Sequence, residues 1–186
     1  MIEVEIRGRL TESEYESLKR DLGAKGEFVA HLEREMYLFS GYAGYSGNFT
    51  DRATDIRLRN TNGECELMVK QKAGEGREET SLKLQDRNLD KAKLAMRVLG
   101  FTKALKMERS MDLFRYREIE WQIVRTPKGL WYWEAEQGTV SEDQVQQVHD
   151  RLIAEADALG LRVMTPAELT DFIALLDREV NVEVDL

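Results

Sequence analysis

The chain has little of the residues that build disulfide frameworks and histidine–cysteine metal sites. Among its 186 residues there are one cysteine and two histidines. Cys65 has no partner for a disulfide within the chain, and so few cysteines are typical of a reducing compartment. His31 and His149 share no metal-ligand spacing, so we expect both on the surface, and we expect Cys65 to be a small core residue.

Long apolar runs and an excess of basic charge are also missing. No run approaches the roughly 18 residues of a membrane span, and the first residues lack the basic and apolar segments of a secretory signal. The net charge is −8, with 42% hydrophobic and 33% charged residues, which is typical of a soluble globular protein without a basic nucleic-acid face. We therefore expect a cytoplasmic monomer or homodimer that binds neither nucleic acid nor membrane.

Four stretches carry the start and stop signals of helices. The clearest start is Thr165–Glu168, where Pro166 takes the first helical position. A second capping box at Ser141–Gln144 is expected to begin a helix, and Gly23 is expected to stop one. The expected helices are 11–22, 86–99 (beginning at Asp86 or Asn88), 141–159 and 165–178, and the tail 179–186 is left unassigned.

About eight strands lie between these helices, mostly joined as hairpins, which predicts an antiparallel sheet. Asn62-Gly63 is a signal for a type I′ hairpin turn. The expected strands are 2–7, 32–39, 55–59, 65–72, 77–84, 107–114, 121–125 and 130–137.

Two of these strands are related by an internal repeat. LEREMYLF (32–39) and MERSMDLF (107–114) each follow a helix ending in Leu-Gly and share five identities in register, with Arg34 matching Arg109. We predict a single domain over 1–186 made of two pseudo-equivalent halves, about 1–85 and 86–140. C-terminal helices over 141–178 and a short tail follow.

Each expected strand has one apolar face and one charged face. The opening MIEVEIRGRL, for example, alternates apolar residues with Glu3, Glu5 and Arg7. Alternation alone favours an open sheet with its charged face in water. The other architecture that fits is a closed barrel with the helices on its apolar outside. Because burying unpaired ions is costly, the inside of such a barrel must be wet, and it would suit a polyanion with metal ions.

The order of the charged motifs resembles the CYTH superfamily, the triphosphate tunnel enzymes that include tripolyphosphatases, thiamine triphosphatase and class IV adenylate cyclases. Glu3-Val4-Glu5-Ile6-Arg7 resembles the family's N-terminal Glu-x-Glu-x-Lys signature, and Glu134-Ala135-Glu136 resembles its closing Glu-x-Glu. Arg57-Leu58-Arg59, Lys70, Arg77-Glu78-Glu79 and Arg109 resemble its basic positions. The resemblance implies an α+β fold, a closed antiparallel β-barrel of about eight strands forming a tunnel with a charged lumen.

The resemblance also implies a triphosphate site. Guanidinium groups match phosphate oxygens, and carboxylates are hard ligands for Mg²⁺ or Mn²⁺. The implied metal ligands are Glu3, Glu5, Glu134 and Glu136. The implied substrate-binding residues are Arg34, Arg57, Arg59, Lys70, Lys72, Arg77 and Arg109. The implied catalytic residues are Glu5, Arg7 and Lys70. We therefore expect metal-dependent hydrolysis of inorganic tripolyphosphate or of a small organic triphosphate.

Two departures from the family pattern leave other functions open. Arg7 stands where the family has lysine, and a guanidinium does not release its proton and so cannot act as a proton carrier. The aspartate that usually ends the strand before the Glu-x-Glu hairpin is replaced, counting back from Glu134, by Val124 or Arg125. The alternatives are a non-catalytic polyphosphate-binding protein with a degraded metal site and a class IV adenylate cyclase.

Two local questions also stay open at this level. The charged residues could be partners in an internal salt-bridge lattice, above all Arg34, Arg77 and Glu79. The glycine-rich stretch 41–54 is either a lid over a tunnel mouth or a simple connection.

Overall fold

The computed structural model describes residues 2–40, 54–73, 76–139 and 141–186. Apart from Thr54, the stretch 41–54 lies outside these residues, so neither interpretation of it is tested. The side chains of Lys72 and Arg77, both expected to bind substrate, are also outside the description.

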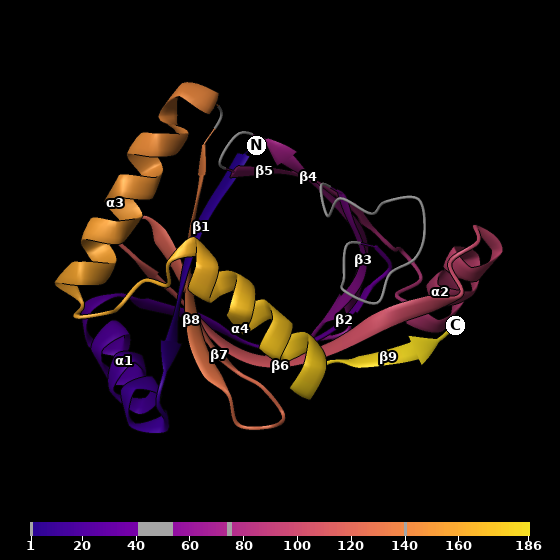
Figure 1. Cartoon of the computed structure of the whole chain (residues 1–186), viewed down its shortest axis with the longest axis horizontal. Helices are drawn as coiled ribbons and strands as arrows, with labels where there is room; N and C mark the ends of the chain where they lie inside the picture. Colours follow the sequence, from indigo (N-terminus) through magenta and orange to yellow (C-terminus); the bar gives the residue numbers. More distant parts are fainter. Residues whose placement is uncertain (1, 41–53, 74–75, 140) are drawn as a thin grey trace.

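Eight strands form a closed antiparallel ring, seen nearly end-on in Figure 1. The hydrogen-bonded order is β2-β3-β4-β5-β1-β8-β7-β6, and β6 also pairs with β2, which closes the ring. The ring strands are β1 (Ile2–Leu10), β2 (Glu27–Leu38), β3 (Thr54–Thr61), β4 (Glu64–Ala73), β5 (Gly76–Lys83), β6 (Lys103–Tyr116), β7 (Ile119–Arg125) and β8 (Trp131–Thr139). The closed architecture is therefore confirmed, and the open sheet is excluded. The unassigned tail forms β9 (Val182–Asp185), which pairs with the start of β6.

The turn predicted from Asn62-Gly63 sets the register of the β3–β4 hairpin. Asn62 and Gly63 both have positive φ angles, 50° and 88°, as a type I′ turn requires. In the β2–β6 ladder Arg34 lies directly opposite Arg109, so the two repeated segments are antiparallel partners. The division of the chain into two halves stays a prediction.

The described residues form four α-helices, which are α1 (Glu12–Lys25), α2 (Leu89–Val98), α3 (Val145–Ala158) and α4 (Pro166–Glu179). α4 begins with the expected reciprocal capping box of Thr165 and Glu168, and α2 begins after Asn88. The expectation at Ser141 is wrong, because its side chain makes no capping bond and a short 3₁₀ turn (Glu142–Gln144) precedes α3. α1 also passes through Gly23 and ends at Lys25, before Gly26.

The main core lies between the outer face of the ring and two helices. α1 and α3 pack over the apolar faces of β1, β6, β7 and β8, around the fully buried Trp121 and Trp133. A second cluster joins α2, through Met96, to the outer faces of β2 and β3. Cys65 is buried, as expected.

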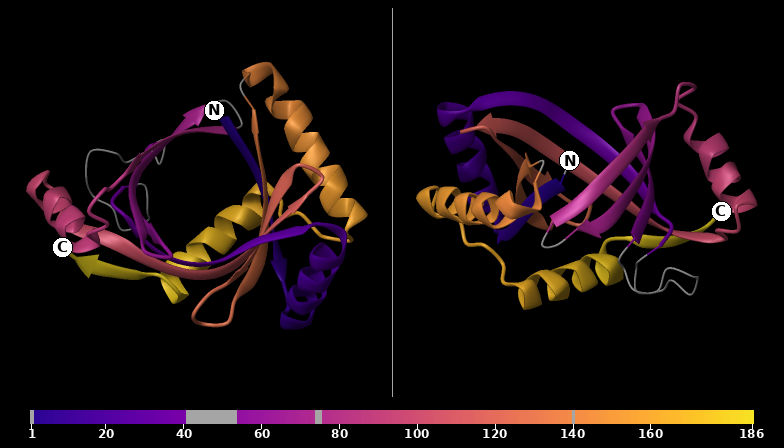
Figure 2. Two further views of the ribbon diagram at one scale, coloured as in Figure 1. Left: turned by 180° about the vertical axis from the view of Figure 1, so that it is seen from behind. Right: turned by 90° about the horizontal axis from the view of Figure 1, so that it is seen from above.

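α4 packs on the other side of the strands. Its Phe172 and Leu176 contact Met111, Val124 and Tyr132, which share strand faces with the charged residues rather than with the outer core. Figures 1 and 2 show α4 lying across one mouth of the ring. Three helices therefore cover the outside as expected, whereas α4 covers the inward face at one end.

Candidate functional site

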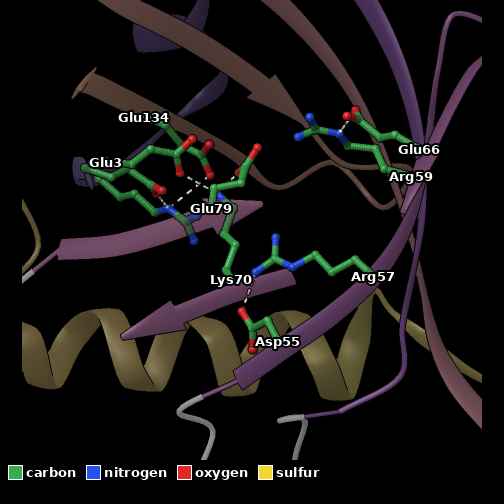
Figure 3. A network of polar contacts seen from close by, with 10 residues as sticks. Glu3, Asp55, Arg57, Arg59, Glu66, Lys70, Glu79 and Glu134 are labelled. Atoms are coloured by element: carbon green, nitrogen blue, oxygen red, sulfur yellow. Dashed lines mark hydrogen bonds and ion pairs between the residues drawn. The ribbon is translucent and has the colours of Figure 1, made fainter. Parts of the chain in front are cut away.

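Charged residues of opposite sign face one another across the inside of the ring. Alternate residues of a strand share a face, so Glu3 and Glu5 of β1 point inward, as do Glu134 and Glu136 of the adjacent β8, and Glu5 lies directly opposite Glu136. Figure 3 shows Glu3, Glu79 and Glu134 gathered near Lys70, with Arg57 and Arg59 extending from β3. We call the inward-facing Glu3, Glu5, Glu134 and Glu136 of β1 and β8 the acidic wall. We call Arg57, Arg59 and Lys70 of β3 and β4 the basic wall.

Lys70 joins the two walls. Its Nζ lies 2.5 Å from Glu3 Oε2 and 2.9 Å from Glu79 Oε2, and its side chain is only 11% exposed. Burial alone would lower the pKa of Lys70, but the ion pair with Glu3 and the hydrogen bond to Glu79 outweigh it and raise that pKa. Lys70 is therefore a charged, largely desolvated ammonium in the interior of the ring.

Arg7 holds the acidic wall together. Its Nε contacts Glu5 Oε1 and lies 3.0 Å from Glu134 Oε1. Burial would raise the pKa of Glu5, but Arg7 outweighs it and lowers that pKa. At Glu134 burial dominates, and with the nearby charge of Glu5 it raises the pKa despite Arg7.

Glu136 completes the acidic wall from β8. Burial, together with the charges of Glu3 and Glu5, raises the pKa of Glu136 to about 8. Its surroundings therefore favour the protonated form of this carboxyl. Crowded carboxylates of this kind are what a divalent cation would stabilise.

The two arginines of β3 each have an acidic partner that the motif comparison did not identify. Arg57 Nη2 lies 2.5 Å from Asp55 Oδ2, and Arg59 Nε lies 2.6 Å from Glu66 Oε1. Arg57 Nε is buried and makes no hydrogen bond to any described residue. The alternation within TDIRLR and the turn at Asn62-Gly63 could have predicted both pairs, since they fix which side chains share a face and which lie opposite.

Arg34 and Arg109 differ in their surroundings. Arg109 is 5% exposed and donates to the Tyr132 hydroxyl (Nε, 3.1 Å) and to Asn181 Oδ1 (Nη2, 2.9 Å). Arg34 donates to Thr61 Oγ1 at 3.2 Å, and burial together with the nearby Arg59 lowers its pKa. Both arginines line a pocket of about 440 Å³ that also contains three glutamates, so the pocket carries both signs of charge.

Gln122 is an inward-facing residue that the family motifs did not single out. Counting back from Glu134 placed the missing aspartate at Val124 or Arg125, but the register puts Gln122 opposite Glu134. Val124 instead packs under α4, and Arg125 is exposed at the end of β7. Gln122 is 8% exposed, and its Oε1 has no hydrogen-bond partner among the described residues.

Comparison with solved structures identifies the fold. No protein-family profile and no curated protein sequence matches the chain. A protein from Pyrococcus horikoshii superposes with a TM-score of 0.71 at 18% identity, covering 90% of this chain and 97% of that one. A proposed adenylate cyclase from Vibrio parahaemolyticus gives a TM-score of 0.66 at 17% identity, covering 92% and 98%. A proposed adenylyl cyclase from Hippeastrum, reported with a dominant triphosphatase activity, gives 0.53 at 16% identity, covering 88% and 90%.

The chain has the CYTH fold. The likeness extends over nearly the whole of each chain compared. At these identities the likeness concerns the fold, and the residues of the site have to be judged by their own geometry. In the described part of this CYTH fold, no helix is long and apolar enough to cross a membrane.

The acidic wall has the donor chemistry of a divalent-cation site but not a ready-made ligand cluster. Its four inward-facing carboxyl groups are hard oxygen ligands of the kind that Mg²⁺ and Mn²⁺ prefer. Within residues 2–40, 54–73, 76–139 and 141–186, however, no three acidic, histidine or cysteine side chains converge as metal ligands do. Arg7 and Lys70 lie against these carboxylates instead. The donor set fits a hard cation, provided that the resident ion pairs rearrange.

Proposed function

We propose that the protein binds a small triphosphate inside the ring and hydrolyses it with the help of a divalent metal ion. The observation that carries this proposal is the pairing of a basic wall with an acidic wall in one enclosed set of strands. Arg57, Arg59 and Lys70 lie within one hairpin, β3–β4, and their side chains are at most 20% exposed. A triphosphate with about four negative charges would complement such a wall.

The basic residues would position the substrate. A guanidinium binds phosphate oxygens in bidentate fashion, and Arg57 has a buried N–H that is not used by any described residue. Lys70 offers three donors, two of which already engage carboxylates. Phosphoryl transfer depends mainly on such positioning and on charge stabilisation, so these residues account for the largest part of the proposed activity.

The metal-binding role would fall to Glu3, Glu5, Glu134 and Glu136. A bound Mg²⁺ or Mn²⁺ would supply charge neutralisation at the phosphoryl group and a water of lowered pKa. The ion pairs that Arg7 and Lys70 make with these glutamates do not oppose metal binding strongly, because the Coulombic gain of a buried ion pair roughly balances its desolvation cost. A polyanion with its metal can therefore exchange partners with Arg7 and Lys70.

The contacts of Arg7 favour one alternative, a triphosphate-binding protein without catalysis. A guanidinium held between Glu5 and Glu134 offsets part of the charge of the acidic wall without a metal, and because it does not release its proton it cannot act as a proton carrier. A cyclase is the second alternative, supported by the proposed activities of the Vibrio and Hippeastrum proteins. A cytoplasmic location, the absence of nucleic-acid and membrane binding, and a monomeric or homodimeric state stay predictions.

The test is phosphate release from tripolyphosphate, ATP and thiamine triphosphate with Mg²⁺ or Mn²⁺, together with an assay for cyclic AMP from ATP. We expect release from at least one triphosphate and no cyclic AMP. Tight calorimetric binding of tripolyphosphate without any turnover would leave only the binding function. The paired change Glu134→Gln with Glu136→Gln should abolish release, whereas Glu183→Gln on β9 should not. Metal-dependent release that survives the paired change would exclude the proposed metal ligands.

A further inference from the structure

Arg7 lies where a cation would be held by the acidic wall. The β1–β8 ladder places Arg7 directly opposite Glu134, and places Glu5 opposite Glu136. Its guanidinium contacts the carboxylates of Glu5 and Glu134, one from each Glu-x-Glu pair. A divalent cation bound by the acidic wall would draw on the carboxylates of the same Glu-x-Glu pairs. Arg7 and a divalent cation would therefore compete for these carboxylates.

We propose that Arg7 is a built-in counter-ion of the acidic wall, and that a triphosphate must draw it away before a divalent cation can bind there. This inference rests on the proposed function and specifies how the site is regulated. Metal binding then depends on the presence of the triphosphate. By thermodynamic linkage, the metal must strengthen triphosphate binding by the same factor.

Arg7 can exchange its carboxylate partners for a phosphate group without losing its ionic hydrogen bonds. A phosphate group offers a guanidinium the same bidentate acceptor geometry as a carboxylate, with more negative charge. The side chain of Arg7 is 27% exposed and that of Lys70 is 11% exposed, so Arg7 is the less enclosed of the two. When Arg7 turns to a phosphate, two carboxylates lose their counter-ion, and a divalent cation restores neutrality. No covalent step is required.

Gln122 gives independent support for a ligand at this point. Its amide is 8% exposed, lies opposite Glu134 in the ladder, and has an Oε1 without a hydrogen-bond partner among the described residues. A buried acceptor left unpaired is costly, so such groups are commonly completed by water or by an ion. Beside Glu134, this oxygen is available as a hard ligand for a cation.

The experiment is calorimetric titration of the full chain with Mn²⁺ alone, without any triphosphate. The variants are Arg7→Met and Arg7→Gln, which both remove the competing charge, the first with an apolar and the second with a polar side chain. Arg9→Met is the matched control, because Arg9 is on the same strand and the same face but lies over the Phe172 ring, 5.3 Å from its centroid. Thermal unfolding would establish that each variant is folded.

We expect weak Mn²⁺ binding in the unchanged protein and in Arg9→Met, and binding tighter by on the order of tenfold in Arg7→Met. Tripolyphosphate titrated in the presence of a chelator should bind Arg7→Met more weakly than the unchanged protein, since a phosphate contact is lost. If Arg7→Met does not fold, a gain of Mn²⁺ affinity in the equally uncharged Arg7→Gln supports the inference and its absence contradicts it. Equal Mn²⁺ affinity in the unchanged protein and in both Arg7 variants would overturn the inference. A lack of triphosphate turnover, by contrast, bears only on the proposed hydrolysis.

Discussion

Arg34 and Arg109 lie directly opposite each other on β2 and β6, yet they have different surroundings. Arg109 is held by the Tyr132 hydroxyl and by Asn181, which follows the end of α4. Arg34 has a single hydroxyl partner, Thr61. The pair is equivalent in the sequence repeat, but only Arg109 fastens α4 across the mouth of the ring. Arg109 is thus a structural anchor as well as an expected ligand, whereas Arg34 donates to a hydroxyl group within the ring.

Replacing these two arginines should separate stability from binding. We expect Arg109→Met to lower the free energy of unfolding by about 2–3 kcal/mol, because it leaves the buried Asn181 and Tyr132 polar atoms without a charged partner. Arg34→Met should change stability by less than about 1 kcal/mol but weaken tripolyphosphate binding roughly tenfold. Urea unfolding and calorimetry measure the two effects. Equal destabilisation by both variants would contradict this division of roles.

Lys70→Met should weaken triphosphate binding more than any change outside the ring. The substitution removes an ammonium that is 11% exposed and leaves Glu3 and Glu79 to repel an incoming phosphate. We expect a loss of affinity for tripolyphosphate of roughly tenfold or more, or about 1.4 kcal/mol, in calorimetric titration. Lys91→Met is the matched control, because Lys91 is an exposed residue of α2 that pairs with Asp86 outside the ring. This substitution should leave the affinity unchanged. Similar losses in both variants would show a non-specific charge effect.

The sequence predicted which residues face inward but not how they are paired. Alternation assigns Glu3, Arg57 and Lys70 to one face whatever the alignment of neighbouring strands. Pairing depends on register, and register depends on the turns and on the positions where each strand begins. This is why a count along the chain placed the missing aspartate at Val124, whereas the ladder places Gln122 opposite Glu134.

Contacts between distant elements were also beyond the sequence patterns. The apolar face of α4 is equally suited to the outside or to the mouth of the ring, and only the positions of Met111 and Tyr132 decide between them. The anchoring of Arg109 by Asn181 follows from that choice. Likewise, nothing in the spacing of His31 and Asp112 indicates that β2 and β6 bring them together.

His31 should make stability depend on pH. Its Nδ1 lies 2.7 Å from the buried Asp112 Oδ1, and its Nε2 lies 2.9 Å from Glu33 Oε1, while Lys19 and Ser110 contact the same carboxylates. The hydrogen bonds to Asp112 and Glu33 raise the pKa of His31 above that of the unfolded chain. The stabilisation is therefore fully present below the unfolded pKa and is lost as the pH rises through the folded pKa.

The variant His31→Gln isolates this contribution. We expect the unchanged protein to exceed the variant in free energy of unfolding most at about pH 5.5, where Asp112 with its lowered pKa is still ionised, and least at about pH 9. Urea unfolding of both proteins across this range gives the difference directly. A difference that stays constant with pH would mean that His31 contributes by packing alone.

Gly8 should be the glycine least tolerant of substitution. A Cβ built there would lie 2.2 Å from the carbonyl oxygen of Arg162 and 2.3 Å from Trp133 Nε1, and the first of these is a backbone atom that cannot move aside cheaply. The main chain after α3 is fixed to the same place, because Met164 N–H donates to Arg7 O at 2.8 Å. We expect Gly8→Ala to lower the free energy of unfolding by about 2–3 kcal/mol, as overpacking of a core does.

Gly23→Ala is the matched comparison for Gly8→Ala. Gly23 lies inside α1, and its added Cβ would meet only the Phe114 ring at 3.9 Å, an ordinary contact. Alanine favours a helix interior over glycine by about 0.5–1 kcal/mol, so this substitution should raise the free energy of unfolding by up to that amount. Urea unfolding of the two variants should therefore give changes of opposite sign. A destabilised Gly23→Ala would show that α1 needs glycine at this position after all, as its sequence first suggested.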